Sequence, residues 1–327
     1  MDRVRWGILS TANIGVTKVI PAMKKANRVD VAAIASRDGK RAGEVAAQLG
    51  IGRTHGSYDA LLADPEIDAI YNPLPNHLHV EWSIKALEAG KHVLCEKPIG
   101  LSVGEAEQLE AAGESYPHLR LMEAFMYRHH PQWIRARELV RSGEIGTLKA
   151  IQSLFSYYNV DPDNIRNQAD VGGGGLMDIG CYPVSASRLL YGSEPRAVNA
   201  MIEFDSHFGT DTYGSVVLEF HGGTASFSYS TQLAPYQRVN ILGTDGRIEI
   251  QIPFNAPPDR PCILELQRGS ETERIEFPTA DQYALQAENM SLAIINDTPV
   301  PTPITDAVAN MRVIERCFAS ARDRRWT

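Results

Sequence analysis

Two short segments of the sequence carry side chains that could move a proton or stabilise a negative charge beside a bound molecule. The first is Glu96-Lys97-Pro98, which directly follows an apolar run at residues 92–94. The residue before a proline is held in an extended conformation, so we expect Lys97 to project from the end of a strand. A lysine there can polarise a hydroxyl or lower the pKa of a neighbouring group. Taken by itself, the same lysine could also be a surface charge.

The second segment joins four glycines to an acid and a tyrosine. Residues 172–175 are all glycine, and Asp178 and Tyr182 follow. Glycine permits a close approach of the backbone to a ligand, and side chains at i and i+4 lie on one face of a helix. A flexible linker is the alternative, although linkers do not usually run directly into an acid, a tyrosine and an apolar helix.

The elements that must position these side chains can be read from the first third of the chain. Short apolar runs lie at residues 4–9, 29–35, 67–71, 92–94 and 119–122, and helical stretches lie between them at 14–26, 39–49, 77–89 and 103–115. Strands that alternate with helices predict right-handed βαβ units and a doubly wound parallel sheet. Ligands of such sheets bind outside the carboxyl ends of the strands, where Lys97 is expected.

The turn after the first expected strand resembles a dinucleotide site in outline. Ser10 and Ala12 stand where the Gly-x-Gly-x-x-Gly fingerprint has glycine, and Gly15 follows. Small residues let backbone N–H groups approach a pyrophosphate at the positive end of a helix. An ordinary turn is the alternative, because the fingerprint is incomplete. The residues expected to contact the dinucleotide here are Gly7, Ser10, Ala12, Asn13 and Ile14.

The end of the second expected strand bears on the choice between NAD and NADP. An acidic side chain there would accept a hydrogen bond from the ribose 2′-hydroxyl of NAD. This sequence has Ser36-Arg37-Asp38, with Lys40 and Arg41 close behind. A guanidinium binds phosphate in a bidentate manner, so Ser36 and Arg37 favour the 2′-phosphate of NADP. In the alternative, Arg37 is solvated, Asp38 holds the ribose and the cofactor is NAD.

Two later loops extend the expected cofactor site, because both follow strands of the same sheet. The pair His77-x-His79 could indicate a metal site, but no cysteine or carboxylate cluster accompanies it. We therefore interpret these histidines as residues at the N-terminus of a helix, and we expect no metal. The expected cofactor contacts in these loops are Asn72, Pro73, Leu74, Asn76, His77, Glu96 and Lys97.

The chain changes its period after about residue 146. Apolar and polar residues alternate in residues 224–231, and glycine-containing turns at 221–223 and 244–246 predict hairpins. We therefore predict an α/β protein with two domains. The doubly wound parallel domain spans residues 1–123, and an α/β domain with a large, mainly antiparallel sheet spans residues 124–327. We expect the last helix to pack back on the first domain.

Composition excludes several classes of protein. The chain has 327 residues and a net charge of −8, which argues against nucleic acid or an anionic membrane as the main partner. The N-terminus shows no signal peptide, and no apolar run is long enough for a transmembrane helix, so a cytoplasmic protein is expected. Four scattered cysteines are too few for a disulfide framework and lack the spacing of a zinc site.

Three motifs together resemble those of the Gfo/Idh/MocA oxidoreductases: Glu96-Lys97-Pro98, Pro75-Asn76-x-x-His79, and the glycine–aspartate segment at residues 173–180. The resemblance covers essentially the whole chain. It implies a Rossmann domain followed by an α/β domain whose open sheet commonly mediates oligomers, here a homodimer or homotetramer. It also implies an NAD(P)-dependent reaction on sugars, polyols or related diols.

Tyr182 indicates which branch of the family this chain resembles, because most members carry histidine four residues after the aspartate. Tyrosine there is similar to the branch with dimeric dihydrodiol dehydrogenases, NADP-dependent xylose dehydrogenases and glucose–fructose oxidoreductase. In that branch a lysine–tyrosine pair is taken as catalytic, which implies Lys97 and Tyr182 here. We hypothesise that Tyr182 exchanges a proton with the reacting oxygen and that Lys97 favours tyrosinate and stabilises oxyanion charge. Asp178 would orient a substrate hydroxyl.

The resemblance also implies contacts in the second domain. Asn164-Ile165-Arg166 is similar to a Trp-Arg pair that approaches the cofactor in relatives, although isoleucine replaces the tryptophan. Two other functions stay open: an enzyme that keeps its cofactor bound, for sugar transhydrogenation or redox-cycling glycoside cleavage, and a non-catalytic nucleotide sensor. The expected substrate contacts are Arg128, Tyr158, Asp178 and Tyr182.

Overall fold

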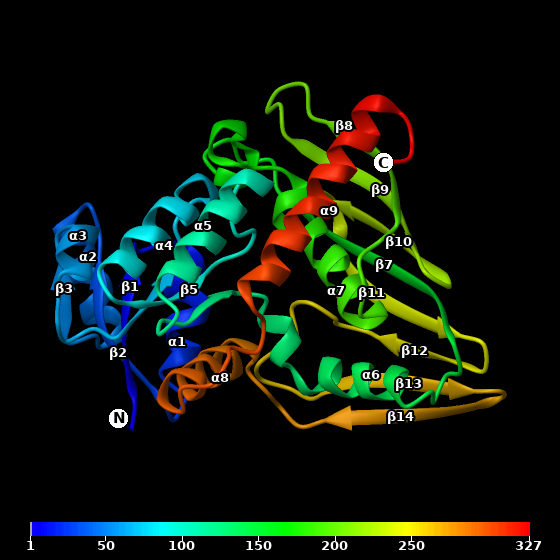
Figure 1. Cartoon of the computed structure of the whole chain (residues 1–327), viewed down its shortest axis with the longest axis horizontal. Helices are drawn as coiled ribbons and strands as arrows, with labels where there is room; N and C mark the ends of the chain where they lie inside the picture. Colours follow the sequence, from blue (N-terminus) through cyan, green and yellow to red (C-terminus); the bar gives the residue numbers. More distant parts are fainter. Residues whose placement is uncertain (1) are drawn as a thin grey trace. The chain divides into compact units, whose positions relative to one another are not determined.

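The computed structural model describes residues 2–327, which divide into two compact units. The first unit contains the chain up to Met126 together with Gln282–Val308. The second unit contains Tyr127–Asp281 and Ala309–Thr327. The chain therefore leaves the first unit once, builds most of the second, returns to the first and ends in the second (Figure 1).

The first unit is built on a six-stranded parallel sheet with the order β3-β2-β1-β4-β5-β6. The strand order reverses between β1 and β4, and doubly wound folds bind their ligands at such a point. The predicted doubly wound sheet is confirmed, although β3 was missed because its three residues are too few to show a period. The strands are β1 (Val4–Leu9), β2 (Val29–Ala35), β3 (Arg53–His55), β4 (Ala69–Asn72), β5 (His92–Cys95) and β6 (Leu121–Glu123).

Polar caps start several helices of the first unit directly after its strands. Side-chain oxygens of Asp38, Ser57 and Ser102 accept hydrogen bonds from backbone N–H groups in the first turns of α2, α3 and α5. A π-helical turn, Gly15–Val19, precedes α1, and a 3-10 turn, Asn76–Leu78, precedes α4. The helices are α1 (Ile20–Met23), α2 (Gly39–Leu49), α3 (Tyr58–Leu62), α4 (His79–Glu88), α5 (Val103–Ser115) and α8 (Gln282–Ile295).

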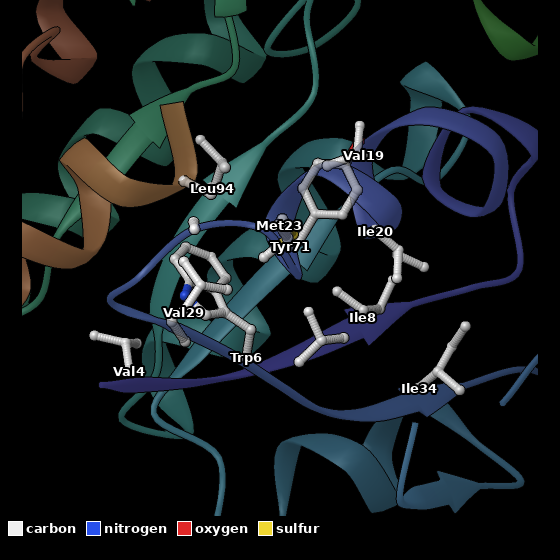
Figure 2. Packing of buried hydrophobic residues seen from close by; sticks show 14 of the residues in the cluster. Val4, Trp6, Ile8, Val19, Ile20, Met23, Val29, Ile34, Tyr71 and Leu94 are labelled. Carbon is white, nitrogen blue, oxygen red and sulfur yellow. The ribbon is translucent and has the colours of Figure 1, made fainter. Parts of the chain in front are cut away.

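The core of the first unit explains why α8 returns to it. Figure 2 shows Trp6 of β1 among Val29, Tyr71 and Leu94 in one buried cluster, which also includes Ala287 and Met290 of α8. The indole N–H of Trp6 donates to Ser291 Oγ of α8 over 3.1 Å. The last helix, which we expected to pack back on the first domain, has its first residues, 304–308, in the first unit and the rest in the second, whereas the helix before it lies wholly in the first unit.

The second unit is built on an eight-stranded sheet with the order β14-β13-β12-β11-β7-β10-β9-β8. Neighbouring strands are antiparallel except for β7 and β10, which confirms the predicted mainly antiparallel sheet. The strands are β7 (Leu148–Tyr158), β8 (Ala197–Phe204), β9 (Asp211–Phe220), β10 (Gly223–Ser230), β11 (Gln232–Gly243), β12 (Gly246–Ile250), β13 (Cys262–Arg268) and β14 (Glu271–Phe277).

The two faces of this sheet differ. Helices α6 (Pro131–Arg141) and α7 (Cys181–Tyr191) pack on the face that includes Phe155 (Figure 1). The register places Met201, Ser215, Ser228 and Leu154 in one row on the opposite face. Met201 is 60% exposed, so an apolar side chain faces solvent at the edge of this row.

The last helix, α9 (Ile304–Asp323), belongs to the second unit from Ala309 onward. Its Asn310 and Ser320 side chains form hydrogen bonds with Arg188 of α7 and the Ala200 backbone of β8. No helix in residues 2–327 combines the length and the apolar character that crossing a membrane requires.

Candidate active site

The turn after β1 has the geometry of an anion-binding helix start. Ser10 adopts a left-handed backbone conformation with φ 78°, which is uncommon for a residue with a Cβ. Its hydroxyl accepts a hydrogen bond from the Ala12 N–H over 3.2 Å, and the Val16 N–H bonds to the Ala12 carbonyl over 3.0 Å. The N–H groups of Asn13 and Ile14 therefore stand in the first helical turn, where backbone donors have no intrahelical partner.

Gly7 is closely packed inside the first unit. A Cβ at Gly7 would lie 3.0 Å from Leu61 Cδ1 and 3.1 Å from both Ile67 Cγ2 and Ile70 Cδ1. A side chain at this position would therefore press on these three residues, which is a reason for glycine that is separate from an approach to phosphate.

Asp38 and Arg37, after the end of β2, are the two residues that could bind the ribose of NAD or the 2′-phosphate of NADP. Asp38 Oδ1 caps α2 by accepting hydrogen bonds from the N–H groups of Lys40 and Arg41, at 2.9 and 3.2 Å. Arg37 is exposed, and its side chain hydrogen bonds to Tyr58, whose pKa is raised by burial. Ser36 is buried and its Oγ accepts the Asp38 N–H over 3.1 Å. The exposed guanidinium and the adjacent hydroxyl suit a phosphate group, whereas the carboxylate is engaged by the helix.

The loop after β4 is held by its own buried side chains. The Asn72 amide donates to the His79 carbonyl and to Ser83 Oγ, both over 3.1 Å, and its oxygen accepts the Leu74 N–H. Pro73 and Leu74 are buried, Asn76 is half-buried and His77 is exposed. The Asn72 side chain therefore shapes the turn from inside.

His79 joins this loop to the loop that carries Lys97. Its ring is buried, and its two nitrogens each lie 2.7 Å from a backbone carbonyl oxygen, those of Leu74 and Pro98. Both ring nitrogens of His79 therefore contact backbone atoms of the protein itself. Within residues 2–327, no group of three or more His, Cys, Asp or Glu side chains could hold a metal ion.

Glu96 and Lys97 lie at the carboxyl edge of the sheet, after β5. Glu96 Oε1 accepts a 2.6 Å hydrogen bond from the hydroxyl of Tyr71, which is fully buried on the neighbouring β4. Burial, reinforced by the Glu96 charge, raises the pKa of Tyr71 well above its usual value, so this hydroxyl stays a donor. Lys97 is half-buried and precedes Pro98 through a cis peptide bond. Tyr71 thereby fixes the residue next to the expected catalytic lysine.

In the second unit, Asp178 is the centre of a polar network. Asp178 Oδ2 accepts a 2.7 Å hydrogen bond from the Tyr157 hydroxyl and a 2.9 Å bond from Arg166 Nε. Burial and the adjacent Asp178 charge raise the pKa of Tyr157, which therefore donates. The Asp178 charge is the main cause that raises the pKa of Arg166, and Tyr157 and Tyr182 add to it. The network keeps an acid, a cation and two phenols together.

This network differs from the expectation in two residues. Tyr158 is an expected substrate contact, but the hydroxyl that bonds to Asp178 belongs to its neighbour Tyr157. Tyr158 is 63% exposed, and as the next residue of β7 it points to the other face of the sheet. Arg166, expected at the cofactor, bonds to Asp178, while Ile165 beside it is 43% exposed.

Tyr182 is the second residue of α7, and its ring lies in an aromatic cluster. Its ring centroid lies 5.9 Å from that of Tyr127, 5.8 Å from Phe155 and 5.3 Å from Phe254. The side chain is 5% exposed. Three rings therefore fix the plane of the Tyr182 phenol, which is what a positioned proton donor requires.

Arg128 lies beside the same helix. Its Nε and one terminal nitrogen donate to Ser185 Oγ, at 3.1 and 2.7 Å, and the Ser185 hydroxyl also bonds to the Tyr127 hydroxyl over 2.7 Å. Ser185 lies three residues after Tyr182 on α7. In the second unit, Arg166 is thus joined to Asp178, and Arg128 contacts α7 one turn after Tyr182. The expected cofactor residues other than Arg166 lie in the first unit.

Comparison with known proteins identifies the family. Residues 4–123 match the model of the oxidoreductase family with an NAD-binding Rossmann fold, and residues 133–249 match the model of the GFO/IDH/MocA C-terminal domain. An uncharacterized oxidoreductase of Rhizobium meliloti is 47% identical over 334 aligned positions that cover 100% of this chain and 99% of the relative. The chain belongs to the Gfo/Idh/MocA family. It is a nicotinamide-dependent oxidoreductase, that is, a dehydrogenase or reductase.

Two further relatives have defined activities. The D-xylose 1-dehydrogenase (NADP(+)) 2 of Haloferax volcanii is 41% identical, over 97% of each chain. The 3-ketoreductase KijD10 of Actinomadura kijaniata, solved with NADP and TDP-benzene, is 31% identical, with a TM-score of 0.91 over 97% of this chain and 98% of that one. Other structures of KijD10 carry a tyrosine-to-phenylalanine or a lysine-to-alanine substitution.

Proposed function

We propose that this oxidoreductase transfers a hydride between NADP and a CH–OH carbon of a sugar, polyol or related diol. The observation that carries the proposal is the Asp178 network, in which the carboxylate that can bind hydroxyl groups is held by two hydrogen bonds, with the ring of Tyr182 held by aromatic contacts four residues further along the chain. The sugar-related activities of the similar proteins support the substrate class.

In this proposal, each site residue has one chemical task. Tyr182 exchanges the proton of the reacting hydroxyl, Lys97 stabilises the negative charge that develops on the oxygen, and Asp178 orients a neighbouring hydroxyl. Arg166 and Tyr157 hold the Asp178 carboxylate in place through their hydrogen bonds. When bound, the nicotinamide supplies the hydride acceptor or donor. Tyr157 replaces Tyr158 as the tyrosine on the substrate side.

The preference for NADP follows from the end of β2. We expect Arg37→Ala to raise the KM for NADP⁺ by about 10- to 100-fold and to change the KM for NAD⁺ less than about 3-fold, because a hydrogen bond to a charged group contributes about 1.5–3 kcal/mol. Arg135→Ala, which removes an equally charged exposed side chain of α6, is the matched control for overall charge. Equal losses with both cofactors would show that Arg37 does not read the 2′-phosphate.

The activity itself is tested by reduction of NADP⁺ or NAD⁺ with a panel of aldoses, polyols and diols. The absorbance of the purified protein is recorded first, because a bound cofactor that never exchanges would indicate transhydrogenation or redox-cycling glycoside cleavage. We expect turnover with added NADP⁺ and at least one sugar or diol. Nucleotide binding without turnover on the whole panel would instead indicate a sensor.

We also propose that the chain forms a homodimer or homotetramer through the exposed face of the large sheet. Met201 and Tyr236, which are 60% and 49% exposed, lie on that face with the small residues Ser215 and Ser228 between their strands. We expect Ser228→Arg to convert the oligomer to monomers in sedimentation velocity, because it places a large cation in the middle of the face. Gln108→Arg on the exposed side of α5 is the control. An unchanged sedimentation coefficient for Ser228→Arg would contradict the proposal.

A further inference from the structure

A buried tyrosine–carboxylate pair lies beneath the glycine-rich turn of the second unit. Asp211 begins β9 and Tyr229 is near the end of β10, and they are only 2% and 1% exposed. The Tyr229 hydroxyl donates to Asp211 Oδ2 over 2.6 Å. Burial and the Asp211 charge raise the pKa of Tyr229 well above its usual value, so the phenol remains the donor.

The same carboxylate oxygen holds the start of the segment that carries Asp178. Asp211 Oδ2 accepts the backbone N–H of Leu176 over 2.7 Å, and Leu176 is the first residue of a π-helical turn, Leu176–Gly180. A charge-assisted bond to an N–H in the first turn fixes a helix start both by its direction and by its favourable charge. Asp178 is the third residue of this turn, and Tyr182 follows it on α7.

Glycines around the Tyr229 ring show how closely it packs. A Cβ would lie 2.8 Å from Tyr229 Cε2 at Gly175, 3.1 Å from Tyr229 Cδ1 at Gly180 and 2.4 Å from Tyr229 Cε1 at Gly214. Gly175 precedes the π-helical turn, Gly180 is its last residue, and Gly214 is the cross-strand partner of Tyr229 on β9. At Gly175 and Gly214 the Tyr229 ring is therefore the nearest group that a side chain would meet, so the turn and β9 both lie directly against this ring.

We propose that Asp211 and Tyr229 are positioning residues that set where Asp178 and Tyr182 are held. The hydrogen bond from the phenol orients the Asp211 carboxylate, the carboxylate holds the Leu176 N–H, and the ring supports the turn between Asp178 and Tyr182. The effect on catalysis rests on the function proposed above, whereas the effect on the backbone of the turn does not. Small displacements of a reacting group are costly, since about 1 Å of misplacement can lower a rate by 10²-fold.

Tyr229→Phe tests the pair, with Tyr213→Phe as the matched control. Both variants remove one tyrosine hydroxyl from the same strand pair, but Tyr213 bonds to Ser215 over 2.9 Å on the opposite face of the sheet. We expect amide hydrogen exchange of residues 176–182 in the cofactor-free protein to accelerate by about 10-fold in Tyr229→Phe. We expect kcat to fall by about 10- to 100-fold with the KM for NADP⁺ unchanged. Tyr213→Phe should change none of these.

The two readouts separate this proposal from the proposed function. Exchange rates of residues 176–182 that are equal in the two variants would overturn the positioning role, whatever the activity. Faster exchange in a protein without activity on the substrate panel would retain the anchoring of the turn and reject the function. Faster exchange with unchanged kcat would overturn the catalytic part of the inference. If Tyr229→Phe does not fold, Asp211→Asn, which keeps the shape of the side chain, is measured in the same way and with the same expectations.

Discussion

Replacing Tyr182 by phenylalanine is expected to lower kcat by about 10²–10³-fold, which is within the range that a positioned acid or base contributes. The substitution removes only the hydroxyl, and the ring can keep its packing against Tyr127, Phe155 and Phe254. We therefore expect the melting temperature and the affinity for NADP⁺ to stay close to those of the wild type. Steady-state kinetics, together with cofactor titration by fluorescence, measure both quantities.

Tyr191→Phe is the control for this experiment. Tyr191 is the last residue of the same helix, stacks on Phe220 and donates its hydroxyl to the Thr224 carbonyl. It has no role in the proposed chemistry, so its kcat should match the wild type. Equal rates for Tyr182→Phe, Tyr191→Phe and the wild type would remove Tyr182 from the mechanism and leave the proton to another group.

Replacing Lys97 by methionine is the second change with a large expected effect. We expect kcat/KM for the sugar or diol to fall by about 10²–10³-fold, because the variant removes the positive charge beside the reacting oxygen. In the proposed function the lysine charge also favours the tyrosinate form of Tyr182, so we expect the rate of oxidation by the variant to rise with pH over a higher range than that of the wild type. A pH profile of kcat/KM measures this shift.

Lys85→Met is the control, because Lys85 is an exposed lysine of the first unit that pairs with Glu81 on α4. We expect its profile to match that of the wild type. A Lys97→Met variant that keeps its kcat/KM but has a higher KM for NADP⁺ would show that Lys97 binds the cofactor without acting in the reaction.

Much of the fold could be predicted from the sequence because its signals are periodic and local. Helices α2 and α5 have the predicted bounds, since each begins directly after a residue whose side chain caps the helix. Strand β3 and helix α3 were missed, because three and five residues do not establish a period. The return of α8 to the first unit could not be read either, because it depends on the contact between Trp6 and Ser291, far apart in the sequence.

The sequence indicates which residues belong to the candidate site better than it indicates which of them contact one another. Asp178 and Tyr182 could be found because glycines mark the turn before them. Tyr157 and Tyr158 are adjacent, and only the register of β7 shows that Tyr157 faces Asp178. The alternation of burial along β7, with Phe155 inside, was the signal that could have distinguished the two tyrosines. The partners of His79 and Tyr229 required tertiary contacts that no local pattern contains.

The transfer of deuterium from substrate to cofactor tests whether this protein moves a hydride between a sugar or diol and NADP. The sugar, polyol or diol that turns over best is prepared with deuterium on the carbon that bears the reacting hydroxyl and is incubated with the protein and NADP⁺. We expect the NADPH formed to carry the deuterium at C4 of the nicotinamide and Tyr182→Phe to form it far more slowly. NADPH without deuterium, or no reduction of NADP⁺ by any member of the panel, would rule out the proposed hydride transfer.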